Sequence, residues 1–103
     1  MDLKVFWTDT ALEQLENIFD YYKVNVSINI AKKIIKQIVN KTIQLEKTPR
    51  IGQKEPLLES RKNEYRYLVI DNYKIIYWID NNFVKIATVF DTRQNPTRLK
   101  NEM

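Results

Sequence analysis

An α+β fold is predicted for this chain by a change of hydrophobic period part-way along it. Up to about residue 47 apolar residues recur at helical spacing, whereas from residue 65 they alternate as in strands. A length of 103 residues suits one domain, taken as residues 1–103. We therefore expect two layers, built from an N-terminal strand, a helical hairpin and an antiparallel β-meander.

The N-terminal part predicts a short strand at residues 4–7 and then a helix. Thr8, Asp9 and Thr10 are all N-cap candidates, and Thr10 with Glu13 three residues later forms a capping box. The apolar residues that follow lie at helical spacing: Ala11, Leu12, Leu15, Ile18, Phe19 and Tyr22. Residues 25–27 then break the pattern.

A second, longer helix is predicted to begin after Ser27, which can cap it, and to end at Thr48-Pro49. Its expected buried stripe is Ala31, Ile34, Ile35, Ile38, Thr42 and Leu45, and its other face carries Lys32, Lys33, Lys36, Lys41 and Lys47. Gly52, the only glycine, marks a turn. Because the first helix is acidic and the second basic, the hairpin should be self-complementary, although surface ion pairs contribute little.

Three strands are predicted at residues 65–70, 73–79 and 83–90, joined by the turn-forming sequences Asp71-Asn72 and Asp80-Asn81-Asn82. Alternation divides them into two faces. The more uniformly apolar face, expected against the helices, carries Tyr65, Tyr67, Val69, Ile75, Tyr77, Ile79, Val84, Ile86, Thr88 and Phe90. The other face, expected to be open, carries Arg66, Leu68, Ile70, Lys74, Ile76, Trp78, Lys85, Ala87, Val89, Asp91 and Arg93.

Composition excludes several classes of site. The chain has no cysteine and no histidine, which removes disulfides, thiolate metal sites and the commonest general base. We expect no cofactor and no metal. No signal peptide or membrane span is evident, so a cytoplasmic protein without a membrane partner is expected. The net charge of +4, concentrated between residues 23 and 62, favours an anionic partner.

Four short motifs occur in a family-like order and spacing. They are A-x-x-x-L-x-x-I-x-x-Y from Ala11 to Tyr21, L-x-x-x-P-x-x-G from Leu45 to Gly52, YRYLVIDNYKIIYWID, and VFDTRQNP. Together they resemble the RelE/ParE superfamily of toxins from bacterial type II toxin–antitoxin modules, over about residues 6–96. The resemblance implies the fold of that superfamily, growth inhibition, a role in plasmid stabilization, and a cognate antitoxin as partner.

The superfamily has two functional arms. ParE-like members bind and poison DNA gyrase, and the hairpin, the turn and the strands look closer to this arm. RelE-like members are metal-independent endoribonucleases that cleave mRNA on the ribosome, which requires a base, an acid and cations. By resemblance the basic residues of that arm fall on Arg66, Lys74 and Arg93.

Two departures weaken the ribonuclease alternative. Leu68 stands where RelE has a lysine, and the C-terminal tail lacks the His or Tyr of several members. A base would then have to be a lysine of strongly lowered pKa, or a carboxylate of raised pKa such as Asp91 or Glu55.

The predicted open face also suggests a docking site for the antitoxin. It combines cations with Leu68, Ile76, Trp78 and Val89, an unusual set for a surface that stays wet. A non-toxic nucleic-acid-binding module is a further alternative, but it requires a basic stripe interleaved with exposed aromatics. Only Trp78 is expected beside the cations on that face.

Overall fold

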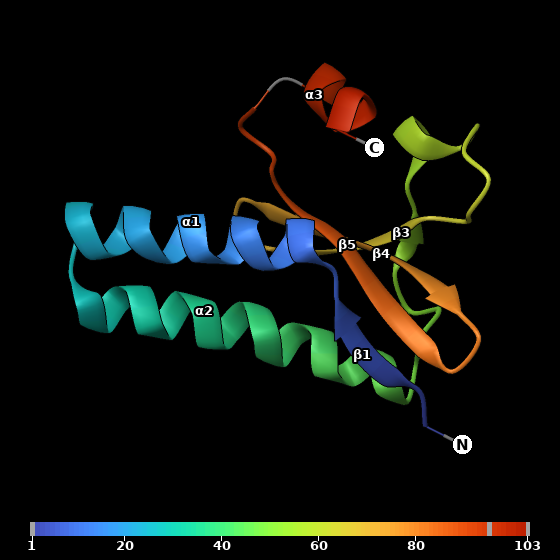
Figure 1. The fold of residues 1–103 in the computed structure, drawn as a ribbon, viewed down its shortest axis with the longest axis horizontal. Helices are drawn as coiled ribbons and strands as arrows, with labels where there is room; N and C mark the ends of the chain where they lie inside the picture. Colours follow the sequence, from blue (N-terminus) through green and yellow to red (C-terminus); the bar gives the residue numbers. More distant parts are fainter. Residues whose placement is uncertain (1, 95, 103) are drawn as a thin grey trace.

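The computed structural model describes residues 2–94 and 96–102, and it contains the predicted strand, helical hairpin and meander in that order (Figure 1). The α+β fold class is therefore confirmed. The elements are β1 (Lys4–Trp7), α1 (Asp9–Asn25), α2 (Ile28–Ile43), the 3-10 turn η1 (Gln44–Glu46), β2 (Gln53–Lys54), the 3-10 turn η2 (Pro56–Leu58), β3 (Arg66–Ile70), β4 (Tyr73–Asp80), β5 (Phe83–Asp91) and α3 (Pro96–Glu102).

The two long helices begin at side-chain caps. Ser27 Oγ accepts a hydrogen bond from the backbone N–H of Ile30 at 3.1 Å, so the predicted cap of α2 is confirmed. The predicted capping box at Thr10 is wrong, because Thr8 Oγ1 accepts from the N–H of Ala11 at 3.2 Å. The same hydroxyl donates to the carbonyl of Ile86 at 2.7 Å. Thr8 therefore begins α1 and fastens it to β5.

The strands form one sheet in the order β1-β5-β4-β3-β2. β1 pairs with β5 in parallel, whereas β3, β4 and β5 form the predicted antiparallel meander. The turn residues Asp71 and Asn81 have positive φ values of 51° and 55°, a conformation that Asp and Asn tolerate better than most residues. β2 and α3 were not predicted, because two residues and seven residues are too short to show a period.

Both faces of the sheet are covered, by different means. α1 and α2 lie side by side over one face (Figure 1). Their cluster includes Ala11, Ile38, Leu68, Ile75 and Val84, all buried. A second, smaller cluster lies on the other face and consists of Leu58, Ile76, Phe90 and Leu99. It is formed where η2 and α3 meet the sheet, so the face that was expected to be open is partly covered.

The predicted division into faces is correct for β4 but wrong for β3 and for the end of β5. Leu68 packs in the helix-side cluster, opposite Ile75, while Tyr65 and Tyr67 pack against the second cluster. The prediction chose the more apolar parity, and that criterion fails where both faces are buried.

On β5 the error has a local cause. Ile86 pairs with Tyr77 and Thr88 pairs with Ile76, so Ala87 is an extra residue on the strand. Such a β-bulge reverses the alternation beyond it. Val89 consequently joins the helix-side cluster and Phe90 the other one.

Candidate functional site

Arg66, the first candidate residue, is held by the loop that precedes β2. Its Nη1 donates to the carbonyls of Gly52 at 2.8 Å and Arg50 at 3.3 Å, and its Nη2 lies 3.1 Å from Glu64 Oε2. Arg66 pairs with Tyr77, whose ring is in the helix-side core. The expected position of Arg66 on the open face is therefore wrong, and its guanidinium joins the loop to β3.

The loop approaches β4 closely at Gly52. The Gly52 N–H donates to Tyr77 Oη at 3.0 Å. A Cβ added to Gly52 would lie 2.5 Å from that oxygen and 2.6 Å from the carbonyl oxygen of Tyr67. Only glycine fits at this point, which explains the one glycine of the chain in terms of packing.

Lys74 lies on the opposite face and is paired with a buried carboxylate. Its Nζ lies 2.9 Å from Glu55 Oε2, whose side chain is fully buried, and 4.2 Å from the centre of the Tyr67 ring. The other oxygen of Glu55 accepts from the N–H of Leu57 at 3.1 Å. Because a buried carboxylate requires a partner, the ammonium of Lys74 serves to compensate Glu55.

Arg93 and Asp91 form a two-point ion pair just beyond β5. Arg93 Nη2 lies 2.8 Å from Asp91 Oδ2, and Arg93 Nε lies 3.0 Å from Oδ1. Oδ1 also accepts from the backbone N–H of Arg93 at 2.9 Å. These hydrogen bonds lower the pKa of Asp91 from its ordinary value, despite some burial, and the carboxylate in turn raises the pKa of Arg93.

The pair borders a hollow of about 560 Å³ that lies between α1 and the end of β5. Asp91 pairs with Tyr73, whose ring belongs to the helix-side cluster, so Asp91 is not on the face that was predicted for it. The Tyr73 hydroxyl donates to Tyr22 Oη at 3.5 Å. Burial, followed by this contact, raises the pKa of Tyr73.

The three cations therefore do not converge on one place. Arg66 lies at the loop edge of the helix-side face, Lys74 lies on the other face against Glu55, and Arg93 lies beyond β5 against Asp91. Their predicted grouping on a single open face is wrong. The arrangement can stabilise loops and strand ends, but it does not provide three donors to one phosphate.

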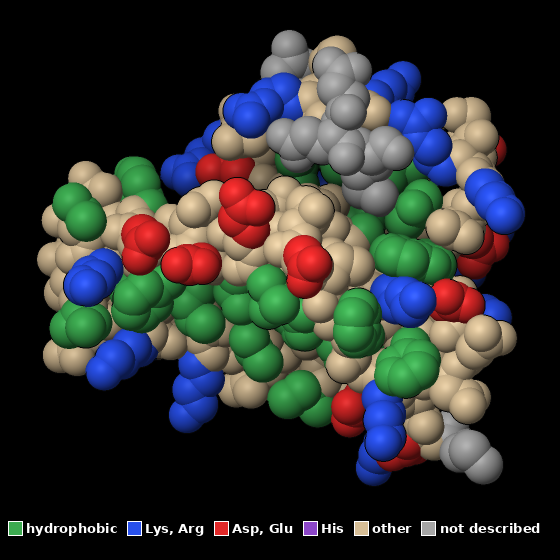
Figure 2. Space-filling model, viewed as in Figure 1, with side chains coloured by type: hydrophobic (Ala, Val, Ile, Leu, Met, Phe, Trp, Pro, Cys, Tyr) green, Lys and Arg blue, Asp and Glu red, His purple; other side chains and the backbone are tan. Residues whose placement is uncertain are grey.

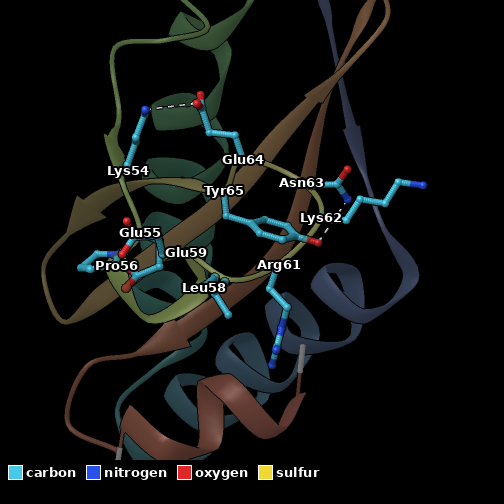
Figure 3. A pocket seen from close by; sticks show the side chains of 10 residues that line it. All are labelled: Lys54, Glu55, Pro56, Leu58, Glu59, Arg61, Lys62, Asn63, Glu64 and Tyr65. Carbon is cyan, nitrogen blue, oxygen red and sulfur yellow. Dashed lines mark hydrogen bonds and ion pairs between the residues drawn. The ribbon is translucent and has the colours of Figure 1, made fainter.

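A second hollow, of about 360 Å³, lies between η2 and the segment that leads into β3 (Figure 3). The Tyr65 ring extends across it, and Asn63 Nδ2 donates to the Tyr65 hydroxyl at 3.4 Å. Glu64 pairs with Lys54 at 3.3 Å, which lowers the pKa of Glu64. Charged groups of both signs line this hollow, and two of its three acids, Glu55 and Glu64, are already paired with lysines. In the part of the chain that the structure describes, no cluster of acidic side chains could hold a metal ion.

Most of the residues predicted to dock an antitoxin are not accessible. Leu68 and Val89 are in the helix-side core, and Ile76 is buried beneath Leu58 and Leu99. Only Trp78 is partly exposed. The predicted placement of the other three on an open surface is wrong, for the two reasons given above for β3 and β5 and because α3 and η2 cover Ile76.

A set of aromatic side chains runs across the uncovered part of the same face. Phe6 and Phe83 are 49% and 42% exposed and have ring centroids 6.4 Å apart. Lys85 Nζ lies 5.9 Å from the rings of Phe6 and Trp78, and the Tyr65 and Trp78 centroids are 5.7 Å apart. We call this set, Phe6, Phe83, Lys85, Trp78 and Tyr65, the aromatic row. The strand pairing of the first four residues and the packing of Tyr65 against the second cluster place the row on the face opposite the helices.

Comparison with known families identifies the chain. A family model described as the ParE toxin of the type II toxin–antitoxin system, parDE, matches residues 5–96. The chain belongs to this family. It is thus a toxin of the ParE/RelE kind, and the resemblance noted in the sequence is confirmed. None of the curated proteins matches the sequence.

Solved structures agree with this fold. The chain is similar to the chromosomal ParDE system of P. aeruginosa, with a TM-score of 0.73, 21% identity, and coverage of 86% of this chain and 95% of that one. It is also similar to the toxin–antitoxin complex RelBE2 of Mycobacterium tuberculosis, with a TM-score of 0.63, 20% identity, and coverage of 88% and 99%. At these identities the likeness concerns the fold.

Sequence reasoning missed the aromatic row of this toxin for a clear reason. Phe6 lies in a four-residue strand whose partner the sequence does not indicate, and Phe83 is the first residue of β5, so neither residue was assigned to a face. A parallel pairing of residues 4–7 with residues 83–86 brings the two rings together. Given that pairing, simple alternation would have placed Phe6, Lys85 and Trp78 on one face.

Proposed function

We propose that this ParE-family toxin arrests growth by binding DNA gyrase in the cytoplasm, without cleaving RNA, until an antitoxin neutralises it. The observation that carries the proposal is the separation of the three candidate catalytic cations. Cleavage of RNA by its own 2′-hydroxyl needs cations around one phosphate and a base of suitable pKa. Arg66, Lys74 and Arg93 instead have separate partners in separate places.

The two carboxylates that could serve as general base, Asp91 and Glu55, also favour a toxin that does not cleave RNA. A general base at neutral pH needs a pKa near 7, and the pKa of Asp91 is lowered by Arg93. Glu55 accepts from Lys74 and from the N–H of Leu57, so both of its oxygens are occupied. Neither carboxylate suits the role of base, which favours a toxin that acts by binding.

The test compares two products in cells that express the chain. On the gyrase proposal, double-strand DNA breaks and an SOS response accompany growth arrest, while mRNA remains intact. With purified gyrase and supercoiled DNA, the added chain should increase the amount of linear DNA. Truncated mRNA without DNA breaks would overturn the proposal and favour the ribonuclease alternative.

One observation supports that alternative and gives it a separate test. Arg93 is 57% exposed and borders the larger hollow, so it could reach a phosphate if its ion pair opened. Loss of one charge-stabilising donor typically lowers a rate by about 10²–10³. Arg93→Ala should therefore abolish toxicity on the ribonuclease alternative and retain most of it on the gyrase proposal. Thermal melting of the variant controls for folding.

We propose that the antitoxin covers the aromatic row. Aromatic side chains are enriched at protein interfaces, and Trp and Tyr are among the residues that most often dominate binding. Because Lys85 is already paired with Asp80 at 2.9 Å, the rings of the row rather than its charge would supply the contact. In hydrogen-exchange measurements on the complex, β1 and β5 should be protected beyond their level in the free toxin.

Two substitutions compare the row with an exposed apolar residue outside it. Phe6→Ala should weaken antitoxin binding by tenfold or more. Val69→Ala, at a similarly exposed strand residue away from the row, should leave it unchanged. Equal effects of the two substitutions would contradict the placement.

A further inference from the structure

The helical hairpin has an apolar surface that this chain does not cover. The core side of α2 is formed by Ala31, Ile38 and Thr42, each at most 1% exposed. A second stripe, displaced around the helix, runs through Ile28, Ile35, Val39 and Ile43 at spacings of seven, four and four residues. Ile28 is 44% exposed and Ile43 is 51% exposed, with the other two half-buried. α2 packs against α1 as well as against the sheet, yet Ile28 and Ile43 of this second stripe remain largely exposed.

The first helix extends this surface with Leu12, which is 48% exposed, and the half-buried Phe19. Figure 2 shows hydrophobic side chains, in green, forming a strip between the two helices on the left of the view. We call this strip, formed by Leu12, Phe19, Ile28, Ile35, Val39 and Ile43, the hairpin strip.

Charges of opposite sign border the hairpin strip. On α1 the exposed acidic residues Asp9, Glu13, Glu16 and Asp20 follow one line of the helix, at spacings of four, three and four. On α2 the exposed lysines are Lys32, Lys33 and Lys36. In Figure 2 the red row lies above the green strip, and blue side chains lie at its lower margin.

The two charged rows do not neutralise each other within one molecule. Among the described residues, no ion pair joins the acids of α1 to the lysines of α2. The sequence-based expectation of a self-complementary hairpin therefore fails inside the monomer. Both rows remain exposed and available to a partner.

We propose that the partner of the hairpin strip is a second copy of this chain. A two-fold axis that runs along the strip brings the hairpin strip of one copy onto the hairpin strip of the other. The same axis exchanges the acidic margin and the basic margin. The acidic row of each copy then faces the lysine row of the other, on both sides of the axis. An arrangement of acid, apolar strip and base is self-complementary under this symmetry, whereas a strip with one sign of charge on both margins would repel its copy.

The dimensions set the expected strength. Sixteen residues of helix are about 24 Å long, and two adjacent helices are about 20 Å wide, so the face has about 500 Å² per copy. The total buried area of about 1,000 Å² is at the lower limit of specific interfaces. We therefore expect a weak dimer, with a dissociation constant in the micromolar range that rises with salt. The aromatic row lies across the sheet from the helices, so this dimer and the proposed antitoxin contact are compatible.

The experiment reverses one charged row at a time in the purified full chain. Glu13→Lys with Glu16→Lys makes both margins basic, and Lys32→Glu with Lys36→Glu makes both margins acidic. Analytical ultracentrifugation should show a tenfold or greater increase in the dimer dissociation constant for each variant alone. A mixture of the two variants should form a heterodimer, because their margins are then complementary.

An apolar pair of substitutions tests the strip itself. Ile43→Asp should abolish the dimer, while Ile51→Asp, at a residue of similar exposure outside the helices, should preserve it. Circular dichroism checks that both variants remain folded. Three results would each overturn the proposal. They are a wild-type chain that stays monomeric at about 100 μM, charge-reversed variants that dimerise like the wild type, and a mixture of the two charge-reversed variants that stays monomeric. A monomeric wild type whose antitoxin affinity falls with Ile43→Asp would also overturn it, since the strip would then belong to the antitoxin.

Discussion

The two faces of the sheet are covered by segments of very different length. On one face α1 and α2, two helices of 17 and 16 residues, follow β1 directly and bury a large cluster. On the other face, two short segments meet, η2 with three residues and α3 with seven. The long helices leave little of their face accessible, whereas the short segments leave the aromatic row uncovered. On the sheet itself, the surface that a partner can reach is therefore the part that the short segments leave uncovered, whereas the hairpin offers a surface only on its outer side, at the hairpin strip.

The difference also concerns how each face is stabilised. The helix side is apolar and has its caps at Thr8 and Ser27, whereas the other side includes the buried ion pair of Glu55 and Lys74. Four tests examine these contributions, beginning with the largest expected effect.

Ile75 and Ile76 are neighbours on β4 that point to opposite faces, and both are 0% exposed. Ile75→Ala should lower the free energy of unfolding by about 4 kcal/mol, because the surrounding helices cannot collapse into the cavity. Ile76→Ala should cost about 2.5 kcal/mol, since α3 is held by few contacts and can move inward. Urea denaturation measures both values. Equal losses would show that the short segments pack as rigidly as the hairpin.

Lys74→Met tests the ion pair of the second face. The substitution removes the ammonium and leaves Glu55 buried without its charge partner, and we expect a loss of about 3 kcal/mol. Adding Glu55→Gln to Lys74→Met should recover part of this loss, because an amide is less costly to bury than an unpaired carboxylate. Urea denaturation of Lys74→Met, Glu55→Gln and the double variant gives the coupling free energy between the two side chains. A single variant as stable as the wild type would refute a compensating role for Lys74.

The sequence predicted the fold where one period extended over many residues. The cap at Ser27 and the meander turns at Asp71 and Asn81 follow from local chemistry, and each is confirmed. Of the stripe that was expected to be buried on the second helix, Ala31, Ile38, Thr42 and Leu45 are buried, whereas Ile34 and Ile35 are half-buried. The face of β3 could not be predicted because both parities are apolar. The bulge at Ala87 could not be predicted either, since a register shift depends on the partner strand and leaves no local signal.

The candidate site shows the same limit. The resemblance located Arg66, Lys74 and Arg93, but what each contacts depends on segments far away in the sequence. Arg66 reaches the carbonyl of Gly52, and Lys74 reaches Glu55, which lies 19 residues earlier. These contacts arise because the loop of residues 50–55 returns to the sheet edge as β2, a two-residue strand without a period of its own.

Gly52→Ala tests the point where this loop meets the sheet. The added methyl group would lie 2.6 Å from the carbonyl oxygen of Tyr67, so the loop or β3 must shift. We expect a loss of about 2 kcal/mol in the free energy of unfolding, as for other overpacked sites. Ile51→Ala, at the adjacent exposed residue, is the matched control and should change stability little. A stable Gly52→Ala variant would mean that the loop is not fixed against the strand.

The smallest effect is expected at the ion pair of Asp91 and Arg93, which lies near the surface. Arg93 lowers the pKa of Asp91, so the folded state holds the carboxylate ionised at a lower pH than the unfolded state does. A carboxyl group of lowered pKa contributes stability that is present above its unfolded pKa, about 3.9, and is lost as the pH falls through its folded value. Arg93→Met should therefore melt slightly below the wild type at pH 6, and the difference should decrease below about pH 4 and vanish once the pH is below the lowered pKa of Asp91. The exposure of Arg93 and screening by salt keep the difference small, and it should shrink further at high ionic strength. Thermal melting of both proteins from pH 6 to pH 2 measures it, with Lys62→Met, at an exposed lysine, as a control for the loss of one positive charge. A difference between the wild type and Arg93→Met that grows as the pH falls would contradict the ion pair, because protonated Asp91 has no charge for Arg93 to stabilise.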